Sequence, residues 1–255
     1  MQGKNMPLKG FFITGTDTGV GKTAVGAALL YLIRERGIVA APVKPVQTGA
    51  GPGERGDLDV YLETSNLEPG PGELALMNPY KFRLPASAHL AAETEGAAPV
   101  SPEHIGQCCR KLNEKYEALL VEGVGGLLVP LTRSLTSLEL MRILGLPLVV
   151  VARAGLGTIN HCLLTINTAL NAGLNVAAVV LNRVPELHRE STSKQVIADN
   201  RDIIEELTGV EVWQALPHVP GAGENVESTR ELASHLEAAG AGRLRMIVDS
   251  GESSS

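Results

Sequence analysis

Residues 13–23 read ITGTDTGVGKT, and this stretch decides the fold. It follows the short apolar run Phe11–Thr14 and precedes Ala24–Arg36, where apolar side chains recur with helical spacing. A strand, a glycine-rich loop and a helix therefore occur in the order that a phosphate-binding loop requires. The usual pattern is Gly, four residues and Gly-Lys-Ser/Thr, whereas Gly15 lies one residue too early. The stretch is either a phosphate-binding loop lengthened by one residue or a glycine-rich turn that resembles one.

The residue types in this loop favour the phosphate-binding interpretation. Gly15, Gly19 and Gly21 allow backbone N–H groups to face an anion. Lys22 stands at the start of the helix as a positive charge for phosphates, and the Thr23 hydroxyl is placed to reach a metal ion. The sequence therefore predicts a triphosphate site, and a chance strand-to-helix turn is the less favoured alternative.

Further apolar runs predict the rest of the architecture. Nearly continuous hydrophobic stretches are typical of strands that are buried on both faces of a parallel sheet. The runs are Phe11–Thr14, Val39–Val43, Ala118–Val121, Leu148–Ala152 and Val176–Leu181, with a weaker sixth at Glu211–Leu216. We expect a three-layer α/β/α fold of the P-loop NTPase type with a mainly parallel central sheet. Residues 1–255 form a single domain in this interpretation, with surface loops at 49–56 and 68–73 and a flexible tail at 247–255.

Polar residues follow the predicted strands, at the sheet edge where α/β proteins bind their ligands. Lys44 follows the second run, where its charge would face a transferred phosphoryl group or an anionic substrate. Glu122 follows the third run, a place that suits a carboxylate near Mg²⁺. Asp57 or Asp59 could add another carboxylate, and spacing alone does not choose between them. Arg153 follows the fourth run at the same edge.

The overall composition excludes several classes of partner. The chain has 22 basic and 28 acidic residues, a formal net charge of −6 and no Lys/Arg run, so we expect neither nucleic acid nor membrane as a partner. The three cysteines, Cys108, Cys109 and Cys162, lack metal or redox spacing and are expected to be free thiols. The N-terminus has no long apolar segment, from which we expect a cytoplasmic location.

A set of short motifs in this order resembles the dethiobiotin synthetases, the ATP-dependent carboxylases of biotin synthesis. The motifs are GTDTGVGKT, KPVQTG, NPYKF followed by PASAHLAA, VEGVGGLLVPL, GLGTINH and LNRV, and they run through most of the chain. The loop of that family carries the same additional residue. The resemblance therefore identifies the opening stretch as a true phosphate-binding loop, lengthened by one.

The resemblance implies a reaction and a role for each candidate residue. One amine of 7,8-diaminopelargonate captures CO₂ as a carbamate, ATP phosphorylates the carbamate, and the second amine closes the ureido ring. Lys22 and Lys44 would hold phosphate and carbamate oxygens as catalytic residues. Mg²⁺ would be held by Thr23, Asp57 and Glu122; Asp57 is preferred to Asp59 because its distance to Leu67 is similar to the family's pattern. The nucleotide would contact Gly15, Asp17, Thr18, Gly19, Val20, Gly21, Lys22 and Thr23, with Asn182, Pro217, His218 and Val219 near adenine. The substrate would contact Lys44, Thr48, Gly123, Val124 and Gly125. The family also implies a homodimer in which the partner subunit completes the diamine site.

Two other groups have similar loops. The amide-forming ligases of cobalamin synthesis add a glutamine-hydrolysing domain with a nucleophilic cysteine, and this chain has neither the length nor a Gly-x-Cys-x-Gly elbow for it. Partitioning ATPases need a Lys five residues before the loop Lys, where this chain has Asp17, and the basic surface or amphipathic tail of such switch proteins is missing. Both groups are less favoured than the synthetase.

Overall fold

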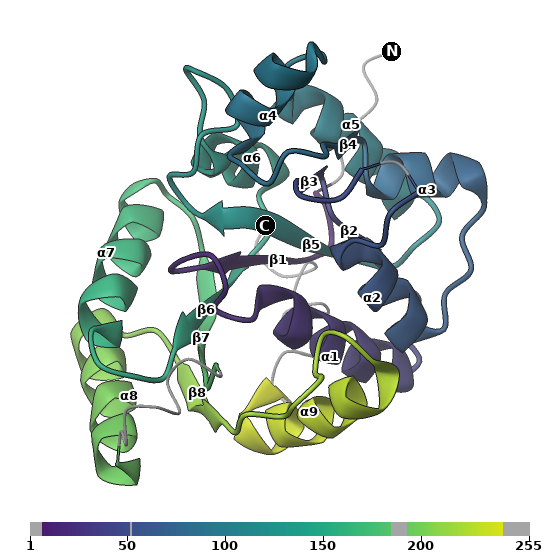
Figure 1. The fold of residues 1–255 in the computed structure, drawn as a ribbon. Helices are drawn as coiled ribbons and strands as arrows, with labels where there is room; N and C mark the ends of the chain where they lie inside the picture. The colour runs from purple at the N-terminus through teal and green to yellow at the C-terminus, as the bar shows by residue number, and fades with distance from the viewer. Residues whose placement is uncertain (1–6, 52, 185–192, 242–255) are drawn as a thin grey trace.

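The fold is a parallel sheet enclosed by helices, described for residues 7–51, 53–184 and 193–241 in a computed structural model (Figure 1). Six strands pair in parallel in the order β2-β5-β1-β6-β7-β8. They are β1 (Gly10–Gly15), β2 (Ala40–Val43), β5 (Ala118–Gly126), β6 (Leu148–Arg153), β7 (Val176–Asn182) and β8 (Val212–Leu216). The predicted three-layer architecture with a mainly parallel sheet is confirmed. The segment 247–255, predicted to be a flexible tail, lies outside the described residues.

One of the predicted strand boundaries was wrong in a way that affects the site. The segment after Val121, predicted to be a loop, is the end of β5, which continues through Glu122 to Gly126. Glycine explains the extension, because a Cβ at Gly123 would lie 2.8 Å from the Phe12 ring of β1. Without that side chain, β5 stays beside β1 and carries Glu122 within the sheet.

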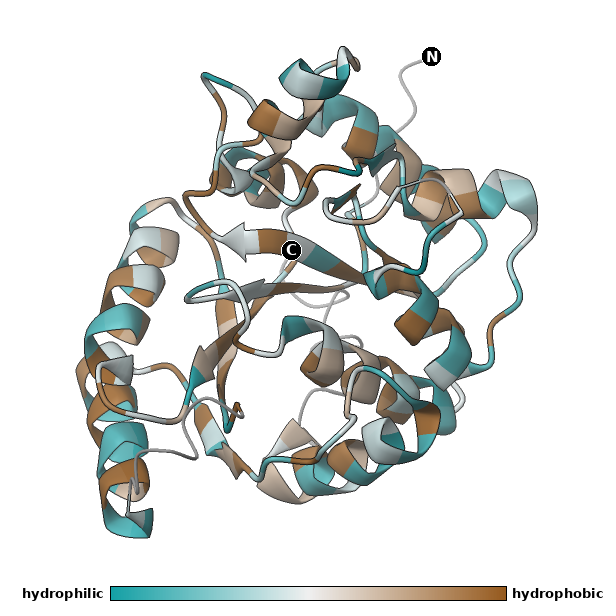
Figure 2. Cartoon of the chain, viewed as in Figure 1, coloured by the Kyte–Doolittle hydropathy of each residue, from teal (hydrophilic) through white to brown (hydrophobic). Residues whose placement is uncertain are grey.

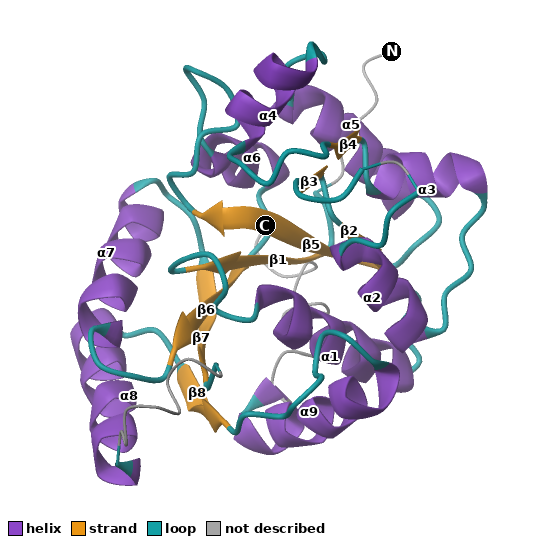
Figure 3. Ribbon diagram, viewed as in Figure 1, coloured by secondary structure: helices purple, strands orange, loops and turns teal. Residues whose placement is uncertain are grey.

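Alternating side chains of the strands pack against two layers of helices. Phe11 and Ile13 of β1 join the core beneath α1 (Lys22–Glu35), α2 (Asp57–Ser65) and α9 (Val226–Ala239). Phe12 joins the core on the opposite face of the sheet, which the other six α-helices of the described chain cover. These are α3 (Pro71–Met77), α4 (Ala88–Glu95), α5 (Pro102–Asn113), α6 (Ser137–Leu144), α7 (Thr158–Asn171) and α8 (Lys194–Thr208). Figure 3 shows the strands as an inner layer with helices on both sides.

The hydropathy of the elements accounts for this layering. Figure 2 shows mostly hydrophobic strands and helices whose colour changes from hydrophobic to hydrophilic around their surface. Strands that are buried on both faces need apolar side chains on both, whereas each helix buries one stripe. The sheet is therefore the centre of the hydrophobic core.

A second, two-stranded sheet lies beyond the end of β2. It pairs β3 (Val46–Gln47) with β4 (Tyr80–Lys81) in parallel. Neither strand was predicted, because each has only two residues and no alternating pattern. The predicted loop at 68–73 was also wrong in its second half: α3 begins at Pro71, where proline suits the first turn of a helix. Of these segments, β3 lies near the phosphate-binding loop, because Val46 and Gln47 line the same cavity as Lys22.

The three cysteines agree with the prediction of free thiols. Cys108, Cys109 and Cys162 are buried and form no disulfide. Burial raises the pKa of the Cys109 thiol to about 12 and that of Cys162 to about 11. Within the described ranges, no helix is both long and apolar enough to cross a membrane.

Candidate active site

The lengthened loop connects β1 directly to α1. Gly19 and Gly21 have φ angles of 73° and 91°, a left-handed conformation that glycine adopts without strain. Gly21 is the N-cap of α1, so Lys22 and Thr23 form the first turn of the helix. The Lys22 ammonium donates a hydrogen bond back to the carbonyl oxygen of Asp17 at 2.9 Å. The loop thus presents the N-terminus of a helix together with a lysine, which is an arrangement suited to anions.

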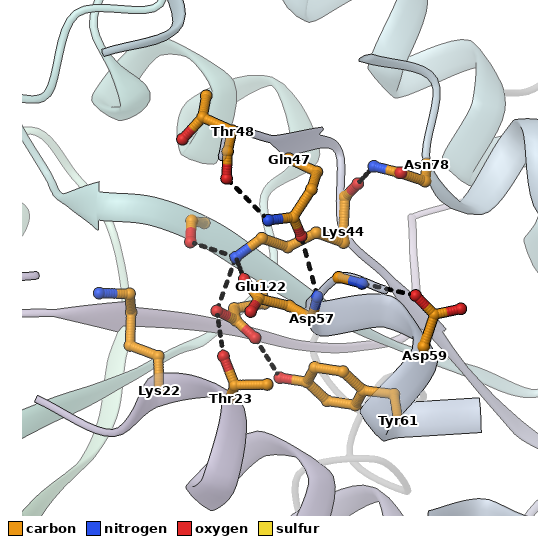
Figure 4. Close-up of polar contacts among 12 residues, drawn as sticks. Lys22, Thr23, Lys44, Gln47, Thr48, Asp57, Asp59, Tyr61, Asn78 and Glu122 are labelled. Atoms are coloured by element: carbon orange, nitrogen blue, oxygen red, sulfur yellow. Dashed lines mark hydrogen bonds and ion pairs between the residues drawn. The ribbon is translucent and has the colours of Figure 1, made fainter. Parts of the chain in front are cut away.

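A cluster of opposite charges lies beside this loop (Figure 4). Lys44 Nζ is 2.7 Å from Glu122 Oε1 and 2.6 Å from Asp57 Oδ2. Lys44 is 4% exposed and Glu122 is 1% exposed, so this pair is largely removed from water. Lys44, which the sequence alone would place more often in solvent, is instead a buried cation between two carboxylates.

The two lysines of the site have their pKa values shifted in opposite directions. Burial acts to lower the pKa of Lys44, but the charges of Glu122 and Asp57 and their hydrogen bonds outweigh it and raise the pKa above its usual value. Burial lowers the pKa of Lys22, and the more distant charge of Glu122 opposes that effect only in part. Lys44 is therefore held as an ammonium, whereas no carboxylate in the described part of the chain forms an ion pair with Lys22.

Glu122 has three donors around its carboxylate. Thr23 Oγ1 donates to Oε1 at 3.1 Å, on the same oxygen that contacts Lys44. The Tyr61 hydroxyl donates to Oε2 at 2.7 Å. Burial and the charge of Glu122 raise the pKa of Tyr61 well above its usual value. The sequence prediction missed Tyr61; the available signal was its spacing of four residues from Asp57, which puts both on one face of a helix.

Asp57 and Asp59 differ in what their side chains contact. Both lie in the first turn of α2 rather than in a loop before it. Asp59 accepts a hydrogen bond from the backbone N–H of Gly56 at 2.7 Å and so caps its own helix. Asp57 points to Lys44 in the charged cluster. Of the two, Asp57 is the one whose carboxylate faces the site.

A cavity of about 890 Å³ opens over the loop and the charged cluster. Eleven of the residues predicted for the site line it: Thr18, Gly19, Gly21, Lys22, Thr23, Lys44, Thr48, Asp57, Glu122, Val124 and Gly125. The lining of the cavity also includes Ser87, which the sequence prediction did not select. Ser87 is the N-cap of α4, and its hydroxyl lies 3.0 Å from His89 Nδ1. The volume falls within the range typical of small-molecule sites.

Other predicted residues lie behind or beside this cavity. Gly15 is the last residue of β1, and Val20 is a fully buried residue of the loop itself. The Asn182 side chain at the end of β7 donates to the carbonyl oxygen of Val20 at 3.0 Å, which fixes the loop from beneath. Asp17 forms an ion pair with Arg153 at 2.5 Å, and this contact connects the loop to the end of β6.

The remaining predicted residues lie within β5 or directly after β8. Gly123 belongs to β5, and its carbonyl oxygen accepts from Lys44 Nζ at 3.5 Å. Pro217, His218 and Val219 follow β8 at the edge where the other strands also end. They do not line the 890 Å³ cavity. The structure thus brings the phosphate loop, Lys44 and the carboxylates together and leaves the predicted adenine residues outside that group.

The donor atoms of the cluster suit a hard divalent cation. Thr23, Asp57 and Glu122 offer a hydroxyl and two carboxylates, all oxygen donors. The described residues contain no group of three or more His, Cys, Asp or Glu side chains that could hold a metal by itself. This pattern fits Mg²⁺, which is commonly held by one or two carboxylates together with substrate phosphates.

Sequence comparison finds relatives that cover most of the chain. Residues 9–225 match the family described as an AAA domain. The chain is 43% identical over 218 residues to the ATP-dependent dethiobiotin synthetase of Anaeromyxobacter sp. (strain Fw109-5), covering 85% of this chain and 93% of that protein. The same enzyme of Anoxybacillus flavithermus is 40% identical over 218 residues, with 83% and 93% covered. That of Methanocaldococcus jannaschii is 41% identical over 180 residues, with 69% and 80% covered.

Solved structures with a similar fold are more distant in sequence. A ParA family ATPase from Chlorobium tepidum has a TM-score of 0.52 and 18% identity, covering 95% of this chain and 98% of that one. The septum site-determining protein MinD of Pyrococcus horikoshii, complexed with Mg-ADP, has a TM-score of 0.54 and 17% identity, with 94% and 93% covered. At this level of identity, the likeness shows the fold alone.

Proposed function

Because the chain belongs to the ATP-dependent dethiobiotin synthetases of biotin biosynthesis, we propose that it carboxylates 7,8-diaminopelargonate with CO₂ and closes the ureido ring, using Mg²⁺ and ATP. The observation that carries the proposal is the cluster of Lys44, Asp57 and Glu122 beside the phosphate-binding loop, in one cavity of about 890 Å³. A reaction that joins two anions needs cations held in place, which Lys22 and Lys44 supply here beside carboxylates that could hold Mg²⁺.

The proposed chemistry has three balanced steps. One amine attacks CO₂ and loses a proton to give a carbamate. A carbamate oxygen then attacks the γ-phosphorus of ATP, which forms a carbamic-phosphoric anhydride and releases ADP. The second amine attacks the carbonyl carbon of the anhydride, loses a proton and expels phosphate, and the cyclic urea results.

We propose separate tasks for the residues of the cavity in these steps. Lys22 and the N-terminus of α1 would bind the phosphates, since both face the loop. Lys44 would hold the carbamate or the transferred phosphoryl group, because its ammonium is already fixed at the cavity wall. The backbone beyond Glu122 and the Thr48 side chain would contact the substrate, because Val124, Gly125 and Thr48 line the same cavity as Lys44.

We assign the metal position to Thr23, Asp57 and Glu122. When held there, Mg²⁺ would help to neutralise the charge that develops on the phosphates. The hydroxyl and carboxylates of these residues already converge on one point, next to Lys44. Asp59 is excluded from this assignment because its carboxylate caps α2.

We also propose that two copies assemble into the active form. Support comes from two exposed leucines near α7, because large apolar side chains in solvent often mark a protein interface. Leu156 is 74% exposed and Leu164 is 61% exposed. An interface between subunits would cover them.

The first experiment measures ADP release with Mg-ATP and bicarbonate, with and without 7,8-diaminopelargonate, and searches for the cyclic urea by mass spectrometry. Diamine-dependent ADP with an equal amount of dethiobiotin is the expected result. ATP hydrolysis that ignores the diamine and yields no urea would leave the nucleotide site in place and remove the proposed substrate.

A further inference from the structure

Tyr61 is a buried hydroxyl at the active site to which the proposed reaction assigns no task. It lies on α2 and is 1% exposed. Its Oη donates to Glu122 Oε2 at 2.7 Å, while Lys44 and Thr23 contact the other oxygen of the same carboxylate. Figure 4 shows the phenol reaching Glu122 from the side opposite Lys44. Each oxygen of Glu122 therefore has its own partners.

The neighbouring helix leaves room for this hydroxyl. A Cβ on Gly26 of α1 would lie 2.0 Å from Tyr61 Oη, closer than any two such atoms can approach. Gly26 lies three residues after Thr23 and so shares a face of α1 with it. Only a residue without a side chain at this position allows the phenol to pass between the two helices and contact Glu122.

We propose that Tyr61 is a positioning residue, which holds Glu122 Oε2 so that Oε1 is directed to Lys44, Thr23 and the cavity. A carboxylate on a flexible side chain can rotate and present either oxygen. A hydrogen bond to an ionised group is among the stronger ones in proteins, and here it selects one orientation. Since Glu122 is the proposed metal ligand and Lys44 partner, this inference rests on the proposed function.

The main test replaces the phenol by a ring of the same shape. We expect Tyr61→Phe to lower kcat for diamine-dependent ADP release about tenfold, the effect of losing one hydrogen bond to a charged group. Mn²⁺ should bind several-fold more weakly in the presence of ADP, because the Glu122 carboxylate would no longer be held in the orientation that faces the metal. Electron paramagnetic resonance measures this binding. The KM for the diamine should stay within about twofold, because Tyr61 does not line the cavity.

The chain contains a matched control. The Tyr116 hydroxyl donates to Glu73 Oε1 at 3.1 Å, a tyrosine–glutamate hydrogen bond outside the site. Tyr116→Phe makes the same chemical change and should alter neither kcat nor Mn²⁺ affinity. Wild-type kcat and Mn²⁺ affinity in Tyr61→Phe would overturn the proposal.

A double-mutant cycle separates positioning from packing. In a Glu122→Ala background, Tyr61→Phe should have no further effect on kcat or Mn²⁺ binding, because Tyr61 acts only through Glu122. An additional loss there, or a failure to fold that persists in that background, would show that Tyr61 serves packing and would refute the inference. If the wild type shows no diamine-dependent ADP release, the proposed function fails, and the Mn²⁺ affinities of the variants still decide the role of Tyr61.

Discussion

Lys44 combines two properties that conflict in most proteins, a full charge and almost complete burial. Its ammonium is tolerated because Glu122 and Asp57 lie within 2.7 Å of it. Such a group is costly to leave unpaired, so each member of the cluster constrains the others. The cluster is therefore a structural unit as well as a chemical one.

Removing the Lys44 charge should affect both activity and stability. Lys44→Ala should reduce diamine-dependent turnover at least ~10²-fold, as expected for the loss of a positioned charge-stabilising donor. It should also lower the free energy of unfolding by on the order of 3 kcal/mol, because Glu122 is left buried without its cation. Turnover by ADP release and stability by urea denaturation measure the two effects.

Lys115→Ala is the control, since Lys115 pairs with Glu73 at 2.5 Å on an exposed surface. It should leave turnover unchanged. In the double variant Lys44→Ala/Glu122→Gln, part of the lost stability should return because the unpaired charge is gone. Near-normal turnover in Lys44→Ala would remove Lys44 from the active site.

The sequence predicted that four residues would lie together at the site, because their positions depend on local spacing. Lys22, Thr23, Lys44 and Glu122 were found because each stands at the end of an apolar run or inside the glycine-rich loop. The choice between Asp57 and Asp59 was not accessible from spacing, because it depends on which carboxylate the N-terminus of α2 uses as its cap. Tyr61 was missed because its contact with Glu122 crosses between α2 and the sheet.

At the scale of elements, a capping box fixes the start of α6. The N-cap of α6 is Thr136, whose hydroxyl accepts from the Leu138 N–H and donates to Glu139 Oε2. Glu139 in turn accepts from the backbone N–H of Thr136 at 2.7 Å. This capping box lies far along the chain from the phosphate loop and offers a test of stability alone.

Thr136→Ala should lower the free energy of unfolding by about 1 kcal/mol at neutral pH, the usual effect of losing an N-cap. The Thr136 hydroxyl is the first cause of the lowered pKa of Glu139. A lowered carboxyl pKa contributes stability above the ordinary value of 4.5, and this contribution is lost as the pH falls through the folded value. The difference between Thr136→Ala and the wild type should therefore shrink at acid pH.

Urea denaturation at pH 7 and near pH 3 measures the difference, with kcat as the control that should not change. An equal difference at both pH values would mean that the Glu139 carboxylate takes no part in the cap.

Element boundaries show where sequence patterns stop being informative. Apolar runs located all six strands of the main sheet, because burial on both faces leaves a continuous signal. They did not show that β5 continues to Gly126, because the glycines of this segment give no hydropathy signal. The strand continues because Gly123 fits against the Phe12 ring, a contact that the sequence does not reveal. The two-residue strands β3 and β4 are too short to have any periodicity.

At the scale of the molecule, nucleotide binding should stabilise the whole fold. The loop, α1 and the strand ends form one wall, so a ligand that fills the cavity stabilises the folded state only. At 100 times its dissociation constant, Mg-ATP should add about 2.7 kcal/mol, which corresponds to a rise in Tm of roughly 5–10 °C for a chain of this size. EDTA should remove most of the rise, and Lys22→Ala should nearly abolish it.

Differential scanning fluorimetry with and without Mg-ATP makes this measurement. A full rise in Tm for Lys22→Ala would contradict the assignment of Lys22 to the phosphates.

The proposed dimer gives a second prediction for the whole molecule. Leu164→Glu puts a charge at an exposed leucine of α7 and should convert the proposed dimer to a monomer. Leu207→Glu on α8 is the control, because Leu207 is a similarly exposed leucine at 60% and lies on a different helix. Size-exclusion chromatography with light scattering gives the mass of each; a Leu164→Glu dimer would contradict the placement of the interface on α7.

The order of the strands was the part of the fold that sequence patterns did not supply. A run of apolar residues predicts a strand but not its neighbours, which depend on pairings between distant segments. The placement of β1 between β5 and β6 is one such pairing, and the site depends on it because it brings Glu122 beside the phosphate loop.

That central position of β1 also determines how the protein can be made. Gly10 pairs with Leu119, and Phe12 pairs with Leu148, so β1 is synthesised before either of its neighbours in the sheet. Until the chain has been synthesised past Leu148, β1 is an apolar strand with unpaired edges, the kind of segment that pairs with other chains. Fragments that end before Ala118 contain β1 without either of its neighbours and should therefore aggregate rather than form part of the sheet.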